Sequence, residues 1–447
     1  MKNNKKRAWI ITVDMGYGHQ RASYPLRHLS PTGKVIAANN YAGIPKKDKA
    51  YWGSSRKFYE FVSRLTALPL IGQKIFDLYD KLQSIPPFYP KRDLSKPTIQ
   101  ISQMYRLIRK GWGKHLVDYL NNKNSDIPLI TTFFVPAFMA EEHKFKNDIY
   151  CILTDADISR SWISLAPQKS KIKYLAPCRR VAERLRLYGV PEENIHLTGF
   201  PLPEENLGGS QLRILKEDLA KRIINLDPER RYRQKYCGTL KQFLDGYYHP
   251  HMKQSHPLTL TFAVGGAGAQ RDIATDILFS LKSKILKKQI NLNLVAGSRN
   301  DVYIFFSKLI KRDHLKERLG KNLQIIFDID KETYFKKFND ALRTTDVLWT
   351  KPSELSFYTA LGLPIIMAPI IGSQEEFNRE WLTKVGGGLI QRNPKYTHEW
   401  FFDWVNSGWL AEAAMSGFLD GRQFGVNNIE QVVFEGVKEP ARNYQLL

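Results

Sequence analysis

The chain has 447 residues, 43% of them hydrophobic, and its 67 Lys and Arg against 44 Asp and Glu give it a formal net charge of +23. This length predicts two domains, and the apolar content excludes wholesale disorder. The positive charge predicts an anionic partner such as lipid headgroups or a phosphorylated small molecule, and without a helix-turn-helix, zinc-finger or RNP-type motif a nucleic acid is not expected.

The first residues are basic and then apolar, as in a signal peptide. The apolar run spans only about five residues before Asp14, so it predicts a first strand. No stretch reaches the ~18 apolar residues that span a bilayer. The three cysteines, Cys151, Cys178 and Cys237, are scattered and have no CxxC spacing. A cytoplasmic chain without a disulfide framework or a zinc site is therefore expected.

Short apolar runs alternate with amphipathic stretches, which favours parallel sheets covered by helices on both faces. The strands expected in the first half span residues 8–13, 34–38, 128–133, 149–154, 173–176 and 194–198. Those expected in the second half span residues 258–264, 291–296, 323–327, 346–349 and 364–368. Residues 205–256 are charged and end in His- and Pro-rich sequence, which indicates a segment connecting two α/β domains.

Residues 51–120 contain no clear strand and are rich in cations and aromatic rings. They hold twelve Lys and Arg, five Asp and Glu, and twelve aromatic residues. Amphipathic helices with basic flanks and aromatic faces are typical of an interfacial membrane contact. The alternative is an ordinary helical insertion that packs on the sheet.

Ligands of open parallel sheets bind at the carboxyl ends of the strands, so the loops there are the candidate sites. After the first strand, Gly16 and Gly18 flank Tyr17, and His19 follows at once. The glycines allow a ligand to approach the backbone, and His19 could act as a general base. A tight turn with a surface histidine is the plainer interpretation.

Three further loops carry polar residues. Gly265, Gly266 and Gly268 form a glycine-rich turn after a strand, which resembles a phosphate cradle but lacks the GK[ST] of a P-loop. Asp155 follows an apolar strand, where it could equally cap a helix. Lys351, Pro352, Ser353 and Glu354 follow another strand, and the first turn of a helix there could hold a diphosphate. Carboxylates such as Glu354 or Glu375 could bind sugar hydroxyls.

In chain order, these segments resemble the GT-B-fold glycosyltransferases of the monogalactosyldiacylglycerol synthase and processive diacylglycerol glucosyltransferase group. The matching blocks are DMGYGHQRAS, FYEFVSRLTALPLIGQKIFDLYD, the stretch from ILTDADISRSW to HLTGFPL, and TKPSELSFYTALGLPIIMAPIIGSQEEFN. The resemblance implies two Rossmann-like doubly wound domains facing across a cleft. Residues 1–204 would bind the lipid acceptor, and residues 257–447 would bind a nucleotide sugar, with the last helix packing back on the first domain.

The resemblance also assigns roles. It implies inverting transfer of a hexose from a UDP-linked sugar to a lipid such as diacylglycerol, with no catalytic metal or other cofactor, by a cytoplasmic protein peripheral on the inner face of the cell membrane. His19 would be the base and Asp155 a carboxylate that orients it, with Gly16 and Gly18 in the acceptor loop. The donor would be held by the glycine turn and by Thr350, Lys351, Ser353, Glu354, Gln374, Glu375 and Asn378.

Two departures from the family pattern keep other functions open. Ser159 stands where family members usually carry a histidine, and Ser353 and Glu354 replace a Gly-Gly pair. A UDP-sugar epimerase of the same fold and a non-catalytic protein that binds nucleotide sugars or membranes are therefore the alternatives.

Overall fold

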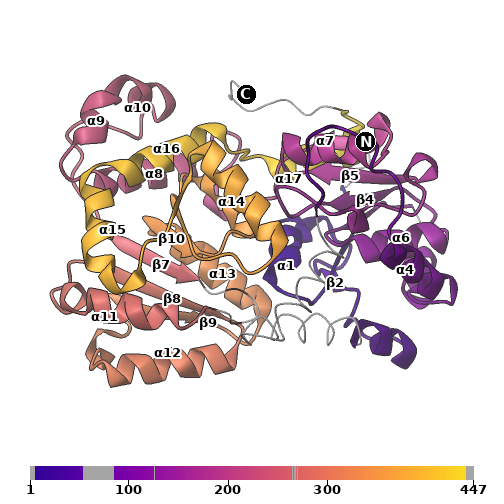
Figure 1. The fold of residues 1–447 in the computed structure, drawn as a ribbon, viewed down its shortest axis with the longest axis horizontal. Helices are drawn as coiled ribbons and strands as arrows, with labels where there is room; N and C mark the ends of the chain where they lie inside the picture. The colour runs from indigo at the N-terminus through magenta and orange to yellow at the C-terminus, as the bar shows by residue number, and fades with distance from the viewer. Residues whose placement is uncertain are drawn as a thin grey trace. The chain divides into compact units, whose positions relative to one another are not determined.

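The computed structural model describes residues 6–53, 85–124, 126–263, 265, 268 and 270–438. The chain divides into two compact units, each built on one six-stranded sheet (Figure 1). Of the described residues, the first unit contains those up to Pro201, Ile371–Phe377, and residues 424–438. The second contains Leu202–Ile370 and Asn378–Gln423. The expected α/β class, with two Rossmann-like parallel-sheet units, is confirmed.

All strands of the first unit run parallel. The order across the sheet is β2 (Ile36–Ala37), β1 (Trp9–Thr12), β3 (Leu129–Thr131), β4 (Ile149–Ile152), β5 (Ile172–Ala176) and β6 (Ile195–Leu197). Every residue of β1, β3 and β4 is buried, as expected for parallel strands with helices on both faces. The six strands expected from the sequence in this half are all present.

The helices of the first unit include one from the far end of the chain. They are α1 (Tyr17–Ser23), α4 (Ile99–Arg109), α5 (Lys114–Lys123), α6 (Phe134–Glu142), α7 (Arg179–Leu187) and α17 (Gly425–Glu435). Ile429 and Val432 of α17 share a hydrophobic core with Ile10 and Ile130 of the sheet. The Asn428 side chain also donates to the carbonyl of Thr198 at 2.8 Å, so α17 is an integral part of this unit.

The sheet of the second unit is also parallel throughout. Its order is β12 (Gly388–Ile390), β11 (Ile365–Met367), β10 (Val347–Thr350), β7 (Thr259–Ala263), β8 (Asn291–Gly297) and β9 (Leu323–Phe327). The five strands expected here are present, and the edge strand β12 was not expected. It has three residues, none of them buried, so it lacks the apolar run that marks the others.

The helices of the second unit cover both faces of its sheet. They are α8 (Arg213–Leu226), α9 (Arg231–Lys235), α10 (Cys237–Phe243), α11 (Ile273–Leu286), α12 (Asn300–Arg312), α13 (Lys331–Leu342), α14 (Ser373–Val385), α15 (Thr397–Asn406) and α16 (Trp409–Asp420). The residues of α14 up to Phe377 group with the first unit. Because β7, β8 and β9 are successive neighbours joined by right-handed crossovers, α11 and α12 lie on the same face.

Short 3-10 helices complete the described elements. They are η1 (Tyr24–Leu29), η2 (Arg160–Trp162), η3 (Pro167–Lys169), η4 (Glu192–Asn194), η5 (Glu204–Asn206), η6 (Lys316–Arg318), η7 (Glu354–Leu361) and η8 (Pro394–Tyr396).

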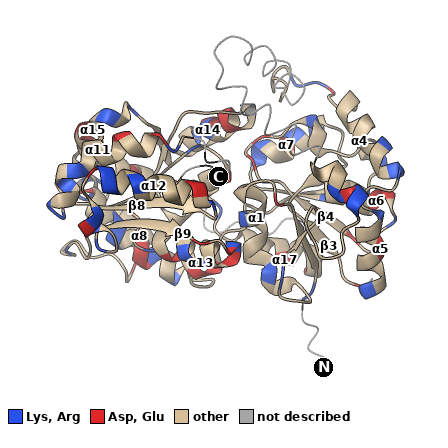
Figure 2. Cartoon of the chain, turned by 90° about the horizontal axis from the view of Figure 1, so that it is seen from below, with Lys and Arg blue, Asp and Glu red and all other residues tan. Residues whose placement is uncertain are grey.

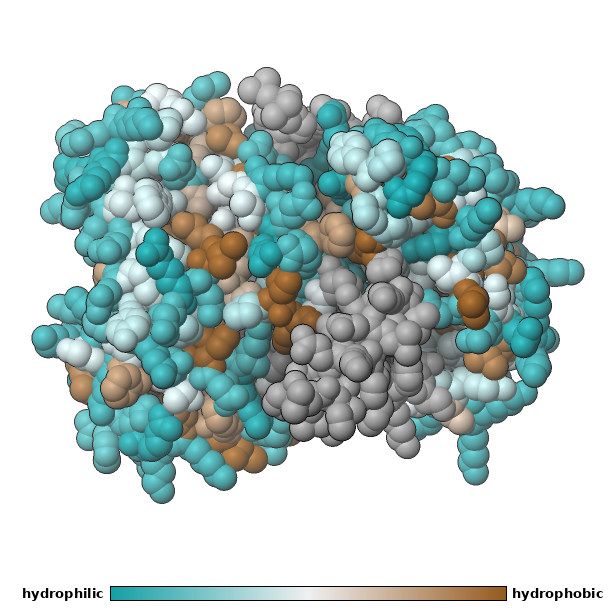
Figure 3. Space-filling model, in the orientation of Figure 1, coloured by the Kyte–Doolittle hydropathy of each residue, from teal (hydrophilic) through white to brown (hydrophobic). Residues whose placement is uncertain are grey.

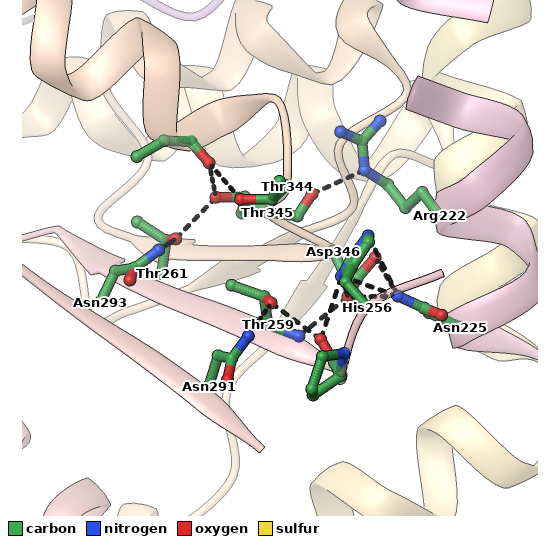
Figure 4. A network of polar contacts seen from close by, with 12 residues as sticks. Arg222, Asn225, His256, Thr259, Thr261, Asn291, Asn293, Thr344, Thr345 and Asp346 are labelled. Atoms are coloured by element: carbon green, nitrogen blue, oxygen red, sulfur yellow. Dashed lines mark hydrogen bonds and ion pairs between the residues drawn. The ribbon is translucent and has the colours of Figure 1, made fainter. Parts of the chain in front are cut away.

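Residues 205–256, expected as a connecting segment, group with the second unit and contain α8, α9 and α10. Arg222 of α8 is buried and donates hydrogen bonds to the backbone carbonyls of Thr345, Leu361 and Gly362 at 2.8–3.0 Å. Nearby, the buried carboxylate of Asp346 accepts from the backbone N–H of Thr259 at 2.8 Å (Figure 4). The bonds from Arg222 fix α8 to the loops that precede β10 and β11, and Asp346 joins the amino ends of β7 and β10.

Candidate functional site

The loop after β1 is held in shape by its own side chains. Gly16 has φ 119°, a conformation that strongly favours glycine, and α1 begins at the next residue. Asn39 Oδ1 accepts from the backbone N–H of Asp14 at 2.7 Å, and Gln20 Nε2 donates to Asp14 Oδ1 at 3.0 Å. His19 and Gly18 therefore lie in the first turn of α1, at the carboxyl edge of the sheet, on a loop of defined geometry.

The imidazole of His19 is half-buried against aromatic rings. Its centroid lies 4.8 Å from that of Phe133, which follows β3, and 5.9 Å from that of Trp162 in η2, which follows β4. Phe134 adds a third ring, 5.1 Å from Trp162 and 4.4 Å from Phe133. The loops after β3 and β4 thus place an apolar wall against His19, which lies on the loop after β1.

This aromatic cluster, made of Phe133, Phe134, Trp162, Trp52 and Trp112, extends away from His19. Trp52 lies 6.5 Å from Phe133 and 5.0 Å from Trp112 between centroids. The tryptophans are buried, whereas Phe133 and Phe134 are half-buried. The sequence analysis assigned no role to the loop after β3. The adjacent Phe133 and Phe134, directly after a strand, are the signal that could have indicated one.

The loop after β4 separates two aspartates with different surroundings. Asp155 is half-buried. Asp157 is fully buried, and its two oxygens accept from Arg184 Nε and Nη2 at 2.8 Å each, while Oδ1 also accepts from the backbone N–H of Ile158. Asp157 therefore anchors α7 to this loop. Ser159, at the position of the family histidine, lies 2.5 Å from Ser161 between hydroxyl oxygens.

In the second unit, two cations flank the glycine turn after β7. A methyl group on Gly265 would lie 2.7 Å from Cε of Lys351, and one on Gly268 would lie 3.4 Å from Nε of Arg299. Gly268 has φ +71° and donates its N–H to the Gly265 carbonyl at 2.7 Å. Gly266, a predicted donor residue, lies outside the described residues. The turn thus has the small residues and neighbouring positive charge that a diphosphate needs.

Arg299 and Arg271 share the carboxylate of Asp301. Arg299 donates to both oxygens of Asp301 at 2.9 and 3.0 Å, and Arg271 Nη1 lies 3.6 Å from Oδ2. The hydrogen bonds from Arg299 hold the pKa of Asp301 below its ordinary value. Asp301 remains ionised at neutral pH and fixes the position of Arg299 beside the glycine turn. The sequence analysis did not single out Arg299.

The predicted donor turn after β10 is tightly enclosed. Thr350 is buried at the end of β10, Ser353 precedes η7, and Glu354 is the first residue of η7 with 9% of its surface exposed. Asn378 is fully buried, and its amide donates to the carbonyl of Pro352 at 3.5 Å. The turn at Lys351 is therefore supported by α14.

The other predicted donor residues lie at the start of α14. One carboxylate oxygen of Glu375 accepts from the backbone N–H of Ile371 at 2.8 Å, and the side chain is 7% exposed. Gln374 is half-buried, and its Oε1 lies within 3.2 Å of where a side chain on Gly372 would begin. Glu375 thus supports the loop after β11.

Within residues 6–53, 85–124 and the described chain from 126 to 438, no group of three His, Cys, Asp or Glu is placed to hold a metal ion. No helix in the described part of the chain is long and apolar enough to cross a membrane. Residues 54–84, which belong to the predicted membrane-facing stretch 51–120, lie outside the described residues.

Comparisons with known proteins give a partial family match and several structural likenesses. Residues 249–395 match the model of a family described as a domain of unknown function, DUF6938. A search of curated proteins found no match.

Three solved structures share the general course of the chain. MnaA of S. aureus with UDP is 10% identical, with a TM-score of 0.46 and coverage of 80% of this chain and 86% of that one. The UDP-GlcNAc 2-epimerase of Neisseria meningitidis bound to UDP-GlcNAc is 12% identical, with a TM-score of 0.42 and coverage of 77% and 83%. MurG of Acinetobacter baumannii is 11% identical, with a TM-score of 0.42 and coverage of 82% and 89%.

Proposed function

We propose that the chain is an inverting glycosyltransferase that moves a hexose from a nucleotide diphosphate sugar, with UDP as the expected nucleotide, to a hydroxyl group of a membrane lipid such as diacylglycerol. The observation that carries the proposal is the position of His19. A titratable imidazole stands at the carboxyl edge of a parallel sheet, in contact with the rings of Phe133 and Trp162. This combination suits an acceptor that is apolar but reacts through a hydroxyl.

His19 would take the proton of the acceptor hydroxyl while the oxygen forms a bond to the anomeric carbon of the donor. The bond from that carbon to the diphosphate breaks, and the nucleotide diphosphate leaves with the electron pair. Attack opposite to the leaving group inverts the anomeric centre. Asp155 is the carboxylate that we assign to orienting the imidazole, and the aromatic rings would pack against the apolar part of the acceptor.

The glycine turn of the second unit would hold the donor diphosphate. Lys351 and Arg299 supply positive charge beside Gly265 and Gly268, and backbone N–H groups of the turn would donate to phosphate oxygens. These groups would stabilise the charge of the departing diphosphate without a metal ion. We assign contacts with the sugar and ribose to Glu354 and Gln374, with Thr350, Ser353, Glu375 and Asn378 supporting their loops.

The protein would act as a peripheral protein on the inner face of the cell membrane. The excess of positive charge, +23 for the chain, supports attraction to anionic lipid.

The test is donor turnover with the purified protein, a panel of UDP-, GDP- and dTDP-sugars, and vesicles of total bacterial lipid. Labelled sugar should appear in the lipid fraction, and His19→Ala should lower the rate by about 10²- to 10⁴-fold, the usual contribution of a general base. His251→Ala, a change of an exposed histidine in the second unit, serves as the matched control and should keep the wild-type rate.

Other outcomes would select other functions. Conversion of the free nucleotide sugar to its epimer, without lipid labelling, would identify an epimerase. No turnover with any donor, while a nucleotide sugar still binds, would identify a non-catalytic relative. Either result would overturn the proposed transfer.

A further inference from the structure

The last turn of α11, α12 and the loops that follow each of these helices in the second unit form a strongly basic region. Residues 282–321 carry eleven Lys and Arg against three Asp and Glu, a net charge of +8 in 40 residues compared with +23 for the whole chain. Lys and Arg are visible around both helices in Figure 2. Lys287, Lys308 and Lys311 are exposed, and within the described part of the chain they form no ion pair.

The same surface also exposes large apolar side chains. Phe279 and Leu286 of α11 are 71% and 40% exposed, and Tyr303 and Ile304 of α12 are 39% and 43% exposed. Residues 279 and 286 are seven positions apart and therefore share one face of α11. In Figure 3, apolar residues lie among hydrophilic ones in the region where Figure 1 places these helices.

Apart from Tyr303, which lies in the first turn of α12 and close in sequence to Arg299, this surface lies away from the candidate donor site. Both helices follow strands whose carboxyl ends carry the glycine turn and Arg299, and both run back towards the amino edge of the sheet. Their carboxyl-terminal ends, with Leu286, Lys287 and Lys311, therefore lie at the edge opposite to that of the glycine turn. Lysines in the last turn of a helix also interact favourably with the helix dipole. That interaction explains the lysines but does not explain why Phe279 and Tyr303 are exposed on the same helices.

We propose that the outer surface of α11 and α12, with Phe279, Leu286, Lys287, Tyr303, Lys308 and Lys311, binds an anionic membrane. Lysines would neutralise lipid headgroups while the aromatic and aliphatic side chains enter the headgroup region. The combination favours a lipid surface over a nucleic acid, since phosphate contacts alone require no exposed apolar side chains. This contact is independent of the proposed glycosyl transfer, because it involves neither donor nor acceptor.

The test is flotation of the full chain with vesicles of phosphatidylcholine alone or with phosphatidylglycerol added, without nucleotide sugar. The triple variant Lys287→Glu, Lys308→Glu, Lys311→Glu is compared with the control Lys241→Glu, Lys253→Glu, Lys395→Glu, which changes the net charge equally at exposed positions of the same unit. Each lysine close to the membrane surface strengthens binding roughly fivefold. We therefore expect about a hundredfold weaker binding for the first variant and a much smaller change for the control.

A second variant tests the apolar contribution. Phe279→Ser combined with Leu286→Ser leaves the charge unchanged, and it should weaken binding to the same anionic vesicles while thermal unfolding stays close to that of the wild type, since both side chains are exposed. Equal losses in both charge variants would mean that net charge alone acts and would overturn the proposal. Unchanged vesicle binding in the apolar variant would also overturn the proposal. So would a triple charge variant that loses binding to a DNA duplex but keeps its binding to the vesicles.

Discussion

Breaking the buried pair between Asp157 and Arg184 should strongly destabilise the first unit. Both side chains are fully buried, and two hydrogen bonds of 2.8 Å join them. Asp157→Asn leaves the buried Arg184 without its carboxylate, and Arg184→Met leaves Asp157 with only the more distant Arg180, whose Nε lies 3.9 Å from Oδ2. Breaking a buried pair in this way typically lowers the free energy of unfolding by about 3–5 kcal/mol. The double variant removes both charges, so its loss should be smaller than the sum of the two single losses by at least about 2 kcal/mol.

The assay must separate the two units, since each can unfold in its own transition. Urea unfolding followed by hydrogen exchange in peptides from β4 and α7 reports on the first unit alone. Peptides from β7 and α11 serve as the internal control and should keep their midpoint. Additive losses in the double variant, or single losses below about 1 kcal/mol, would refute the view that this ion pair holds the loop after β4 to α7.

Three further predictions concern the second unit and the proposed reaction. Gly265→Ala places a methyl group 2.7 Å from Cε of Lys351, so UDP binding measured by calorimetry should weaken by roughly tenfold with an unchanged melting temperature; unchanged binding would remove the turn from the donor site. Burial raises the pKa of Asp346 to about 6, although His256 and Asn225 oppose the shift. Folding favours the protonated form of Asp346. The stability that protonated Asp346 contributes is therefore fully present below about pH 4 and is lost as the pH rises through 6. Between pH 5 and pH 7 the wild type should lose about 1–2 kcal/mol more than Asp346→Asn in urea titrations, and parallel pH profiles would contradict this. Treatment with EDTA should leave transferase turnover unchanged, whereas a loss restored by Mg²⁺ would show that the diphosphate requires a metal.

Much of the fold could be predicted because parallel strands buried on both faces appear as short apolar runs. The expected range 258–264 contains β7, and every residue of β7 is buried. In contrast, β12 begins in the sequence GGGLI and is not buried, so it is defined by pairing with β11 and not by its own composition. A strand that forms only because a neighbouring strand pairs with it cannot be predicted from its own residues.

The sequence could predict the candidate site only where its residues belong to a single loop. Gly16 and His19 are close in the sequence, and the positive φ of Gly16 gives the turn a recognisable residue type. Contacts between loops could not be predicted in this way. Phe133 and Trp162 meet His19 because β3 and β4 follow β1 across the sheet, and Arg299 approaches Gly268 because β8 lies beside β7.

The position of α17 has a consequence for synthesis of the chain on the ribosome. Ile10 and Ile130 are translated early, but the apolar face that covers them, including Ile429 and Val432, emerges almost 300 residues after Ile130. The backbone of α17 also packs directly against the first unit. A side chain added at Gly425 would begin 2.1 Å from the carbonyl oxygen of Phe200. The apolar surface of the first unit that α17 covers therefore stays exposed while the second unit is translated. A fragment ending near Pro201 should aggregate, and one fused to residues 424–438 should not.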